Sequence, residues 1–326
     1  MSKPFNERRR QQFLTEAFYV AAIKHIDDIA LDLRLLFDGP SGDADDKRGW
    51  SFYLSDDAYA RFSLHHTAGT PIEELRNELT GVVEAYERYQ KALAEYEEIP
   101  EVAPLGLGYL GDYERCMQLI GLCYLLHRRD LLPRIAALED PGYRGEDALY
   151  EDLLCYALPE RIETDVMLHL DVYDPLLGAM YGKTDDECIQ SINEYVNHWY
   201  LAFKYVPWHG GYPRIVGTEG DYFGYWAFEA GAVALLCDID DSAITHMVYP
   251  KDLVAWARAN KALSEAKASD STRLRCEANH PCPKEGWWFT PAKADSRRHF
   301  KQGETMPDLG SAWGSTIWQW DENQRG

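Results

Sequence analysis

Apolar residues recur at intervals of three and four along the first hundred positions, the spacing that gathers side chains on one face of an α-helix. The first stripe is closed by residues 37–40, which end in Gly and Pro. The second stripe follows Thr70 and Pro71. The two stripes are Leu14, Phe18, Ala22, Ile26, Ile29, Leu33 and Leu36, then Leu75, Leu79, Val82, Tyr86, Tyr89, Leu93 and Tyr96. The pattern predicts two long amphipathic helices.

Between the two stripes, residues 41–49 are polar and predict a loop. Thr70 and Glu73 have the spacing of a capping box, with Pro71 at the first helical position. The stripe from Leu75 to Tyr96 suits either a neighbouring helix of the same chain or a second copy, so a homodimer stays open. Tyrosine at three of its seven positions favours packing within the chain.

Pro and Gly residues over 100–108 predict a break, and the next helical pattern is a strongly apolar one at 112–127. Thr184 and Glu187 form a second capping-box pattern, which opens a helix that runs through Phe203. Further helices are expected near 131–138, 145–157, 172–181, 221–237 and 250–265. The second half of the chain therefore also reads as helical.

From about residue 269 the sequence becomes rich in Pro, Gly and Trp, as in HPCPKEGWWFTPA and GSAWGSTIWQW. Aromatic and β-branched residues between turn residues predict short strands or a small hairpin. The predicted fold is mainly α, a multi-helical two-domain bundle with a small irregular or β tail. The expected domains are helical at 1–105, helical at 106–268, and the tail at 269–326.

Charge narrows the range of partners. The 326 residues include 33 Lys and Arg against 54 Asp and Glu, a net charge of −21. Residues 1–260 hold 23 basic and 45 acidic residues, so the excess lies in the helical part. Binding to a phosphate backbone requires clustered Lys and Arg, which argues against direct contact with nucleic acid. A negative surface attracts cations or a basic protein, although solubility alone also explains an acidic composition.

The sequence also indicates where the protein works. No run approaches the ~20 apolar residues that cross a membrane, and the N-terminus lacks the apolar segment of a secretory signal. Seven cysteines, an odd number scattered through helical patterns, do not predict a disulfide framework. We therefore expect a cytoplasmic protein without a membrane partner.

Residues with catalytic or metal-binding potential are few. Cys276, His280 and Cys282 could supply three zinc ligands, with His299 as a fourth, but their spacing matches no common zinc module. Glu229 stands in an apolar segment, where burial raises a carboxyl pKa and can mark either a general acid or a structural hydrogen-bond acceptor. A metal- or carboxylate-dependent enzyme built on these residues is the alternative. No catalytic residue, metal or cofactor is assigned.

Three sequence motifs in the second half resemble the C-terminal domain of the PoNi immunity family. They are YFGYWAFEA at 222–230, IDDS at 239–242 and YPKDL at 249–253. In that family a GYW-FEA helix precedes an IDDS turn and a YP-DL helix start. The motif residues are interpreted as determinants of the fold: Trp199, Trp208, Tyr225, Trp226, Phe228, Glu229, Asp240, Asp241, Tyr249 and Asp252.

The resemblance implies an immunity protein, or antitoxin, of a polymorphic or type VI secretion toxin locus. Such a protein binds and blocks a cognate basic nuclease toxin domain, a DNase, and performs no catalysis of its own. Exposed carboxylates are the side chains expected to meet that partner. The candidates form three acidic groups: Asp43, Asp45 and Asp46; Glu95, Glu97, Glu98 and Glu101; and Asp185, Asp186 and Glu187.

Overall fold

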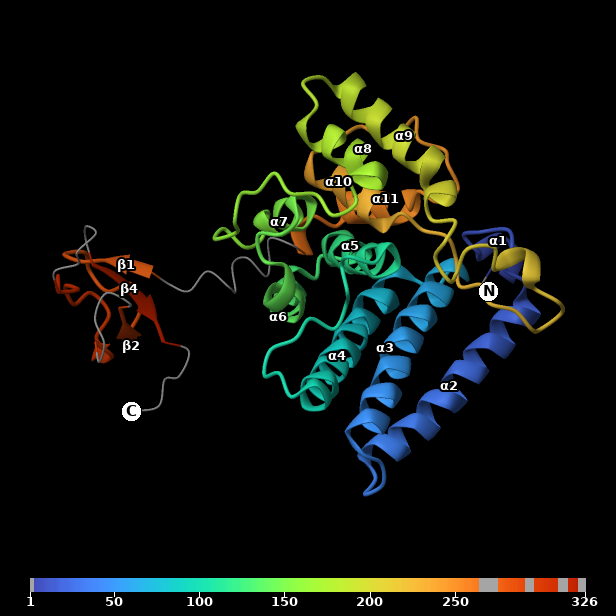
Figure 1. The fold of residues 1–326 in the computed structure, drawn as a ribbon. Helices are drawn as coiled ribbons and strands as arrows, with labels where there is room; N and C mark the ends of the chain where they lie inside the picture. Colours follow the sequence, from blue (N-terminus) through green and yellow to red (C-terminus); the bar gives the residue numbers. More distant parts are fainter. Residues whose placement is uncertain (1–2, 264–274, 291–295, 310–315, 322–326) are drawn as a thin grey trace. The chain divides into compact units, whose positions relative to one another are not determined.

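The computed structural model of the chain describes residues 3–263, 275–290, 296–309 and 316–321. Contacts divide the chain into two compact units, Met1–Lys261 and Ala262–Gly326, and each is described here by itself. The first unit is built of helices and the second of short strands (Figure 1). The expectation of a mainly α fold is confirmed.

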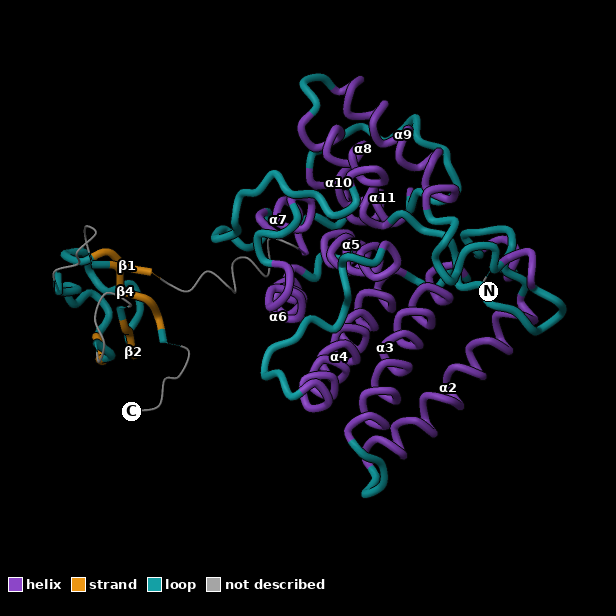
Figure 2. Tube along the Cα trace, viewed as in Figure 1, coloured by secondary structure: helices purple, strands orange, loops and turns teal. Residues whose placement is uncertain are grey.

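The first unit opens with a short helix and three long ones: α1 Phe5–Arg8, α2 Glu16–Asp38, α3 Ala44–Thr67 and α4 Ile72–Glu97. Helices α2 and α4 match the two predicted stripes. Figure 2 shows α2, α3 and α4 as successive rods that run up and down, with α3 in the middle. Helix α4 buries residues from Ile72 to Ala92, whereas α2 buries only Phe18. Helix α2 is therefore the most loosely packed of the three.

The prediction of a loop over residues 41–49 was wrong, because α3 begins at Ala44. The Asp43 carboxylate accepts a hydrogen bond from the backbone nitrogen of Asp46 at 3.0 Å, and the Asp46 carboxylate accepts one from that of Asp43 at 3.2 Å. Two aspartates thus form the capping box that a Glu usually completes. Helix α4 starts where expected, but its N-cap is Pro71 and no side chain caps it.

The remaining helices surround α5, which is almost wholly buried. Helix α10 packs directly across it at Gly121, where an added Cβ would lie 3.0 Å from the Phe228 carbonyl oxygen. Only a residue without a side chain permits this approach. The elements are α5 Leu110–Leu125, the 3₁₀ turn η1 Arg129–Leu131, α6 Leu132–Tyr143, α7 Ala148–Cys155, α8 Leu170–Tyr181, α9 Asp185–Ala202, the 3₁₀ turn η2 Tyr212–Arg214, α10 Phe228–Leu236 and α11 Lys251–Ala259.

The helix expected at 221–237 is shorter than predicted, since only α10 is helical and residues 221–227 run without regular structure. Gly224 has a φ of 117°, a conformation that suits glycine and that no helix contains. The Thr67 hydroxyl donates a hydrogen bond to the Phe223 carbonyl at 2.8 Å. The carbonyls of this segment are thus bound by side chains of other elements instead of by a helix of their own.

A single hydrophobic core joins helices from both halves of the first unit. Its fully buried members include Leu79 of α4, Ile120 of α5, Leu153 of α7 and Val233 of α10. The division of the helical part into two domains near residue 105 stays a prediction. In the described part of the chain, no helix has both the length and the apolar character needed to cross a bilayer.

The second unit contains β1 Arg275–Glu277, β2 Gly286–Phe289, β3 Arg298–Phe300 and β4 Ile317–Trp320. They form an antiparallel sheet in the order β1-β4-β2-β3. Its core includes Trp288, Phe300, Met306 and Trp318. The aromatic residues that predicted short strands are therefore those that hold the sheet together.

Candidate partner-binding surface

The first acidic group marks the start of α3. Asp43 and Asp46 bond to each other's backbone nitrogens, and Asp45 forms an ion pair with Arg48 at 2.5 Å. All three aspartates are exposed. Negative charge at a helix N-terminus is favoured by the helix dipole, so these residues stabilise α3 whether or not they meet a partner.

The second acidic group lies at the end of α4. Glu95 and Glu97 belong to its last turns, Glu98 is its left-handed C-cap with a φ of 57°, and Glu101 follows; all are exposed. The Arg48 guanidinium lies 4.8 Å from the centre of the Tyr96 ring. This contact joins the start of α3 to the end of α4. The structure therefore brings the first two acidic groups to one end of the helical unit.

Apolar side chains are exposed at the same end, and sequence reasoning missed them. Phe52, Tyr53 and Tyr96 are 44%, 60% and 42% exposed. The Phe52 ring contacts both Tyr53 and Tyr89, at centroid distances of 5.5 and 5.4 Å. Two of the three lie in α3, the helix whose start was mistaken for a loop. Aromatic rings within a rim of carboxylates are the composition expected of a protein-binding surface.

The third acidic group is at the start of α9. Thr184 caps this helix by accepting a hydrogen bond from the backbone nitrogen of Glu187 at 3.2 Å, and Asp185 and Asp186 fill its exposed first turn. In Figure 1, α8 and α9 lie at the top of the helical unit, whereas α3 begins at the bottom. The third group is thus separate from the first two.

Glu229 is fully buried among aromatic residues. Its Oε1 accepts hydrogen bonds from the Tyr195 hydroxyl at 2.7 Å and from Trp199 Nε1 at 3.3 Å, while Oε2 has no partner within the described residues. Burial raises the pKa of this carboxyl to about 7. Glu229 therefore joins α10 to α9 from within the core.

A second buried carboxyl, Glu114 of α5, was not identified from the sequence. It accepts hydrogen bonds from Trp208 Nε1 at 2.7 Å and from Gln118 Nε2 at 2.6 Å. Burial, and then the neighbouring charge of Glu229, raise its pKa to about 8. The cavity beside Glu114 holds only about 10 Å³, less than a substrate needs. This geometry supports a hydrogen-bonding role for both carboxyls.

The other motif residues also form local bonds. The aromatic members Tyr225, Trp226 and Phe228 are buried. Tyr249 donates a hydrogen bond to Asp241 at 2.9 Å, and Asp240 accepts one from the backbone of Ser242 at 2.9 Å. Asp252 forms an ion pair with Arg10. The IDDS and YPKDL segments are thus tied to their surroundings by the residues that define them.

The cysteine side chains of the second unit lie against backbone carbonyl groups. Cys276 Sγ lies 3.6 Å from the Pro281 carbonyl oxygen, and Cys282 Sγ lies 3.1 Å from that of Lys284. Within the described ranges, no three His, Cys, Asp or Glu side chains gather as metal ligands would. His280 directs Nδ1 toward the Ala278 carbonyl. Cys276, His280 and Cys282 thus contact backbone carbonyl groups of neighbouring residues.

Part of the first unit is similar to known proteins. Residues 145–253 match the family described as PoNe immunity proteins (PoNi), C-terminal. The crystal structure of protein PA2201 from Pseudomonas aeruginosa is similar with a TM-score of 0.62 and 20% sequence identity, over 78% of this chain and 92% of that one. At this identity the likeness concerns the fold alone. No curated protein matches the chain.

Proposed function

We propose that the whole chain is a PoNi-type antitoxin that binds and neutralises a cognate toxin, because residues 145–253 match the family of PoNe immunity proteins (PoNi), C-terminal. The family match is the observation that carries this proposal. Binding is stoichiometric and requires no chemistry from this chain. The buried carboxyls Glu114 and Glu229 then serve to hold the helical frame rigid.

The charge of the helical part suits a toxin that acts on nucleic acid. A nuclease domain presents basic side chains to the phosphate backbone, and a surface of opposite charge speeds its encounter with an inhibitor. The carboxylates at the α3–α4 end lie beside exposed aromatic rings. In this proposal the charges make association fast, and exposed aromatic side chains such as Phe52 and Tyr53, which the bound toxin would cover, make release slow.

The finer identity of the toxin is also part of the proposal. The order of the motifs and the tail resembles TsiT, which neutralises the type VI secretion nuclease effector TseT. We therefore propose a DNase effector of a type VI system as the partner. In that setting the antitoxin works in the cytoplasm.

Co-expression tests this function directly. The C-terminal domain of the protein encoded next to this chain is expressed in a bacterial host, with and without the full chain. The proposal predicts loss of viability and degraded chromosomal DNA with the toxin domain alone, and survival with both. If the cells die equally in both cases, the chain is not the antitoxin of that protein.

A further inference from the structure

A cleft of about 590 Å³ opens between α2, α3 and the loop of residues 215–223, all within the first unit. It lies within the range of about 300–1,000 Å³ that ligand pockets span. Its apolar wall combines Phe18 and Ile26 of α2, Leu64 of α3 and Phe223 of the loop. We refer to it as the α2–α3 cleft. It exists because α2 packs loosely on α3, with Phe18 as its one buried residue.

Four carboxylates line this apolar cleft: Asp56, Asp57, Glu219 and Asp221. Two of them already have a cationic partner, since Asp56 pairs with Arg115 at 3.1 Å and Asp221 with Arg214 at 3.5 Å. Among the described residues, the lining of the cleft contains His25 but no lysine or arginine. The cleft is therefore negatively charged over a largely apolar floor.

Asp57 is the carboxylate with the most to gain from a partner. It is half-buried, and in the part of the chain that the structure describes its carboxylate has neither an ion pair nor a hydrogen bond. Burial and the adjacent Asp56 raise its pKa to about 6, despite the opposing influence of His25. A half-buried carboxylate without a partner is unfavourable in the free protein, and an arriving cation relieves that cost.

We propose that the α2–α3 cleft receives an arginine or lysine side chain of the cognate toxin, with its charged end against Asp57 and its methylene groups against the half-buried Ala22 and Ile26. Long cationic side chains combine an apolar stem with a charged head, and this cleft offers a matching surface to each. The exposed Val216, which pairs with the lining residue Glu219 across a turn of the bordering loop, offers the toxin an additional apolar contact. This proposal rests on the proposed function and adds the place and chemistry of one anchor.

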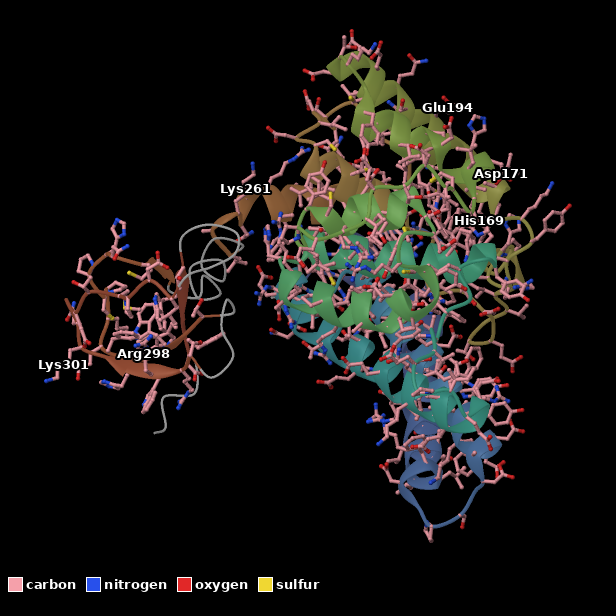
Figure 3. The ribbon with its side chains drawn as sticks, turned by 60° about the vertical axis from the view of Figure 1, so that its left-hand side comes forward. His169, Asp171, Glu194, Lys261, Arg298 and Lys301 are labelled. Carbon is pink, nitrogen blue, oxygen red and sulfur yellow. The ribbon has the colours of Figure 1, made fainter. Side chains whose placement is uncertain are left out.

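The test is a calorimetric titration of the full chain with the toxin domain encoded by the neighbouring reading frame. Asp57→Asn and Glu219→Gln together are expected to weaken the affinity tenfold or more. The matched controls are Asp171→Asn and Glu194→Gln, exposed residues that Figure 3 shows on α8 and α9. Asn has the shape of Asp without its charge, so the thermal midpoint of the cleft variant should stay unchanged or rise. If the cleft variant loses affinity but keeps its thermal midpoint, the lost binding is due to the removed charges and not to a folding defect.

Failure of this proposal differs from failure of the proposed function. If the wild-type chain binds the toxin domain and the cleft variant binds equally well, the cleft proposal is overturned and the antitoxin function stands. If the wild-type chain does not bind, the antitoxin function fails for that partner. The cleft is then tested by NMR with N-acetylarginine methylamide as the ligand in place of the toxin domain. If the compound changes the amide chemical shifts of Gly220 and Phe223 in the wild type but not in Asp57→Asn, the cleft proposal is supported. If it changes neither shift in the wild type, the cleft proposal is rejected.

Discussion

The side chain of Gln11 binds both backbone groups of Tyr225, more than two hundred positions along the chain. Its Nε2 donates a hydrogen bond to the Tyr225 carbonyl at 2.5 Å, and its Oε1 accepts one from the Tyr225 nitrogen at 2.9 Å. The same Oε1 also accepts a hydrogen bond from the Tyr222 hydroxyl at 2.5 Å. One amide thus pairs with the non-helical segment before α10 as a neighbouring strand would. It links the N-terminus of the chain to the GYWAFEA motif.

Removal of that amide should destabilise the whole helical unit. Gln11→Ala leaves the backbone groups of Tyr225 buried without partners, and an unsatisfied buried group costs about 1–3 kcal/mol. We expect the free energy of unfolding to fall by about 3 kcal/mol in urea denaturation. Gln12→Ala, at the adjacent exposed position, is the matched control and should change stability by less than about 0.5 kcal/mol. Equal effects of the two variants would show that the amide does not hold this segment.

The buried carboxyls should make the protein less stable as the pH rises from about 4.5 to about 8. The pKa of Glu229 is raised to about 7 and that of Glu114 to about 8, both above the ordinary value of 4.5. A raised carboxyl pKa favours folding at low pH, and this contribution is lost as the pH rises through the folded value. Glu229→Gln keeps an acceptor for Tyr195 but cannot ionise. Its stability relative to the wild type should rise by about 1–3 kcal/mol between about pH 4.5 and about 7, the interval between the unfolded and folded pKa values.

Urea denaturation across that pH range measures the effect. Glu194→Gln, an exposed position on α9, is the control and should give a difference from the wild type that does not vary with pH. If the unfolding free energy of Glu229→Gln varied with pH in the same way as that of the wild type, the raised pKa of Glu229 in the folded protein would be contradicted.

His66 should add a sensitivity to acid. Its ring is fully buried against Trp226 and Phe228, and neither ring nitrogen has a hydrogen-bond partner within the described structure. Burial, and then the charge of Arg10, hold its pKa well below 6.5. A lowered histidine pKa means that the unfolded chain takes up the proton first. Stability is then lost, by up to about 1.4 kcal/mol per pH unit, as the pH falls below about 6.5.

A leucine at this position tests the effect. His66→Leu changes the packing at every pH, so the informative quantity is the slope of the unfolding free energy between pH 7 and about 5. That slope should be smaller in the variant than in the wild type. His198→Leu, at an exposed position of α9, serves as the control. A slope unchanged in His66→Leu would mean that His66 does not remain neutral in the folded protein.

The acidic groups should differ in their importance for toxin binding. Glu97→Lys with Glu98→Lys reverses two charges at the end where the first two groups meet, beside exposed aromatic rings. Asp185→Lys with Asp186→Lys reverses two charges at the separate third group. Because charge mainly sets the rate of encounter, the first pair should slow association by about tenfold, and the second pair by much less.

Stopped-flow association at low salt compares the two pairs. Equal slowing by both would indicate attraction by the net charge as a whole and would leave the α3–α4 end without a special role. No slowing by either pair would remove the acidic groups from the binding surface.

Much of the fold could be predicted because long helices repeat their apolar residues regularly. The stripes of α2 and α4 and the capping residue Thr184 of α9 correspond to elements of the structure. Helix α3 was missed because it lies between α2 and α4, so its apolar residues are not confined to one face. The segment before α10 was misjudged because Gln11 and Thr67, distant in sequence, satisfy its backbone.

The candidate surface was predictable only in part, because contacts between residues distant in sequence also determine it. Acidic groups can be identified along a sequence, but their assembly depends on the antiparallel pairing of α3 with α4. The Arg48 to Tyr96 contact shows that pairing, and no local pattern reveals it. The α2–α3 cleft likewise depends on how tightly two helices pack, which the spacing of their apolar residues does not determine.

The central claim is stoichiometric neutralisation of a nuclease, and a titration of nuclease activity tests it most directly. Plasmid cleavage by the purified toxin domain is followed as the full chain is added in steps, at low and at high salt. The claim predicts a linear fall in activity that reaches zero at a one-to-one molar ratio, with slower onset at high salt because screening weakens the attraction. Undiminished cleavage at a molar excess of the chain would contradict it.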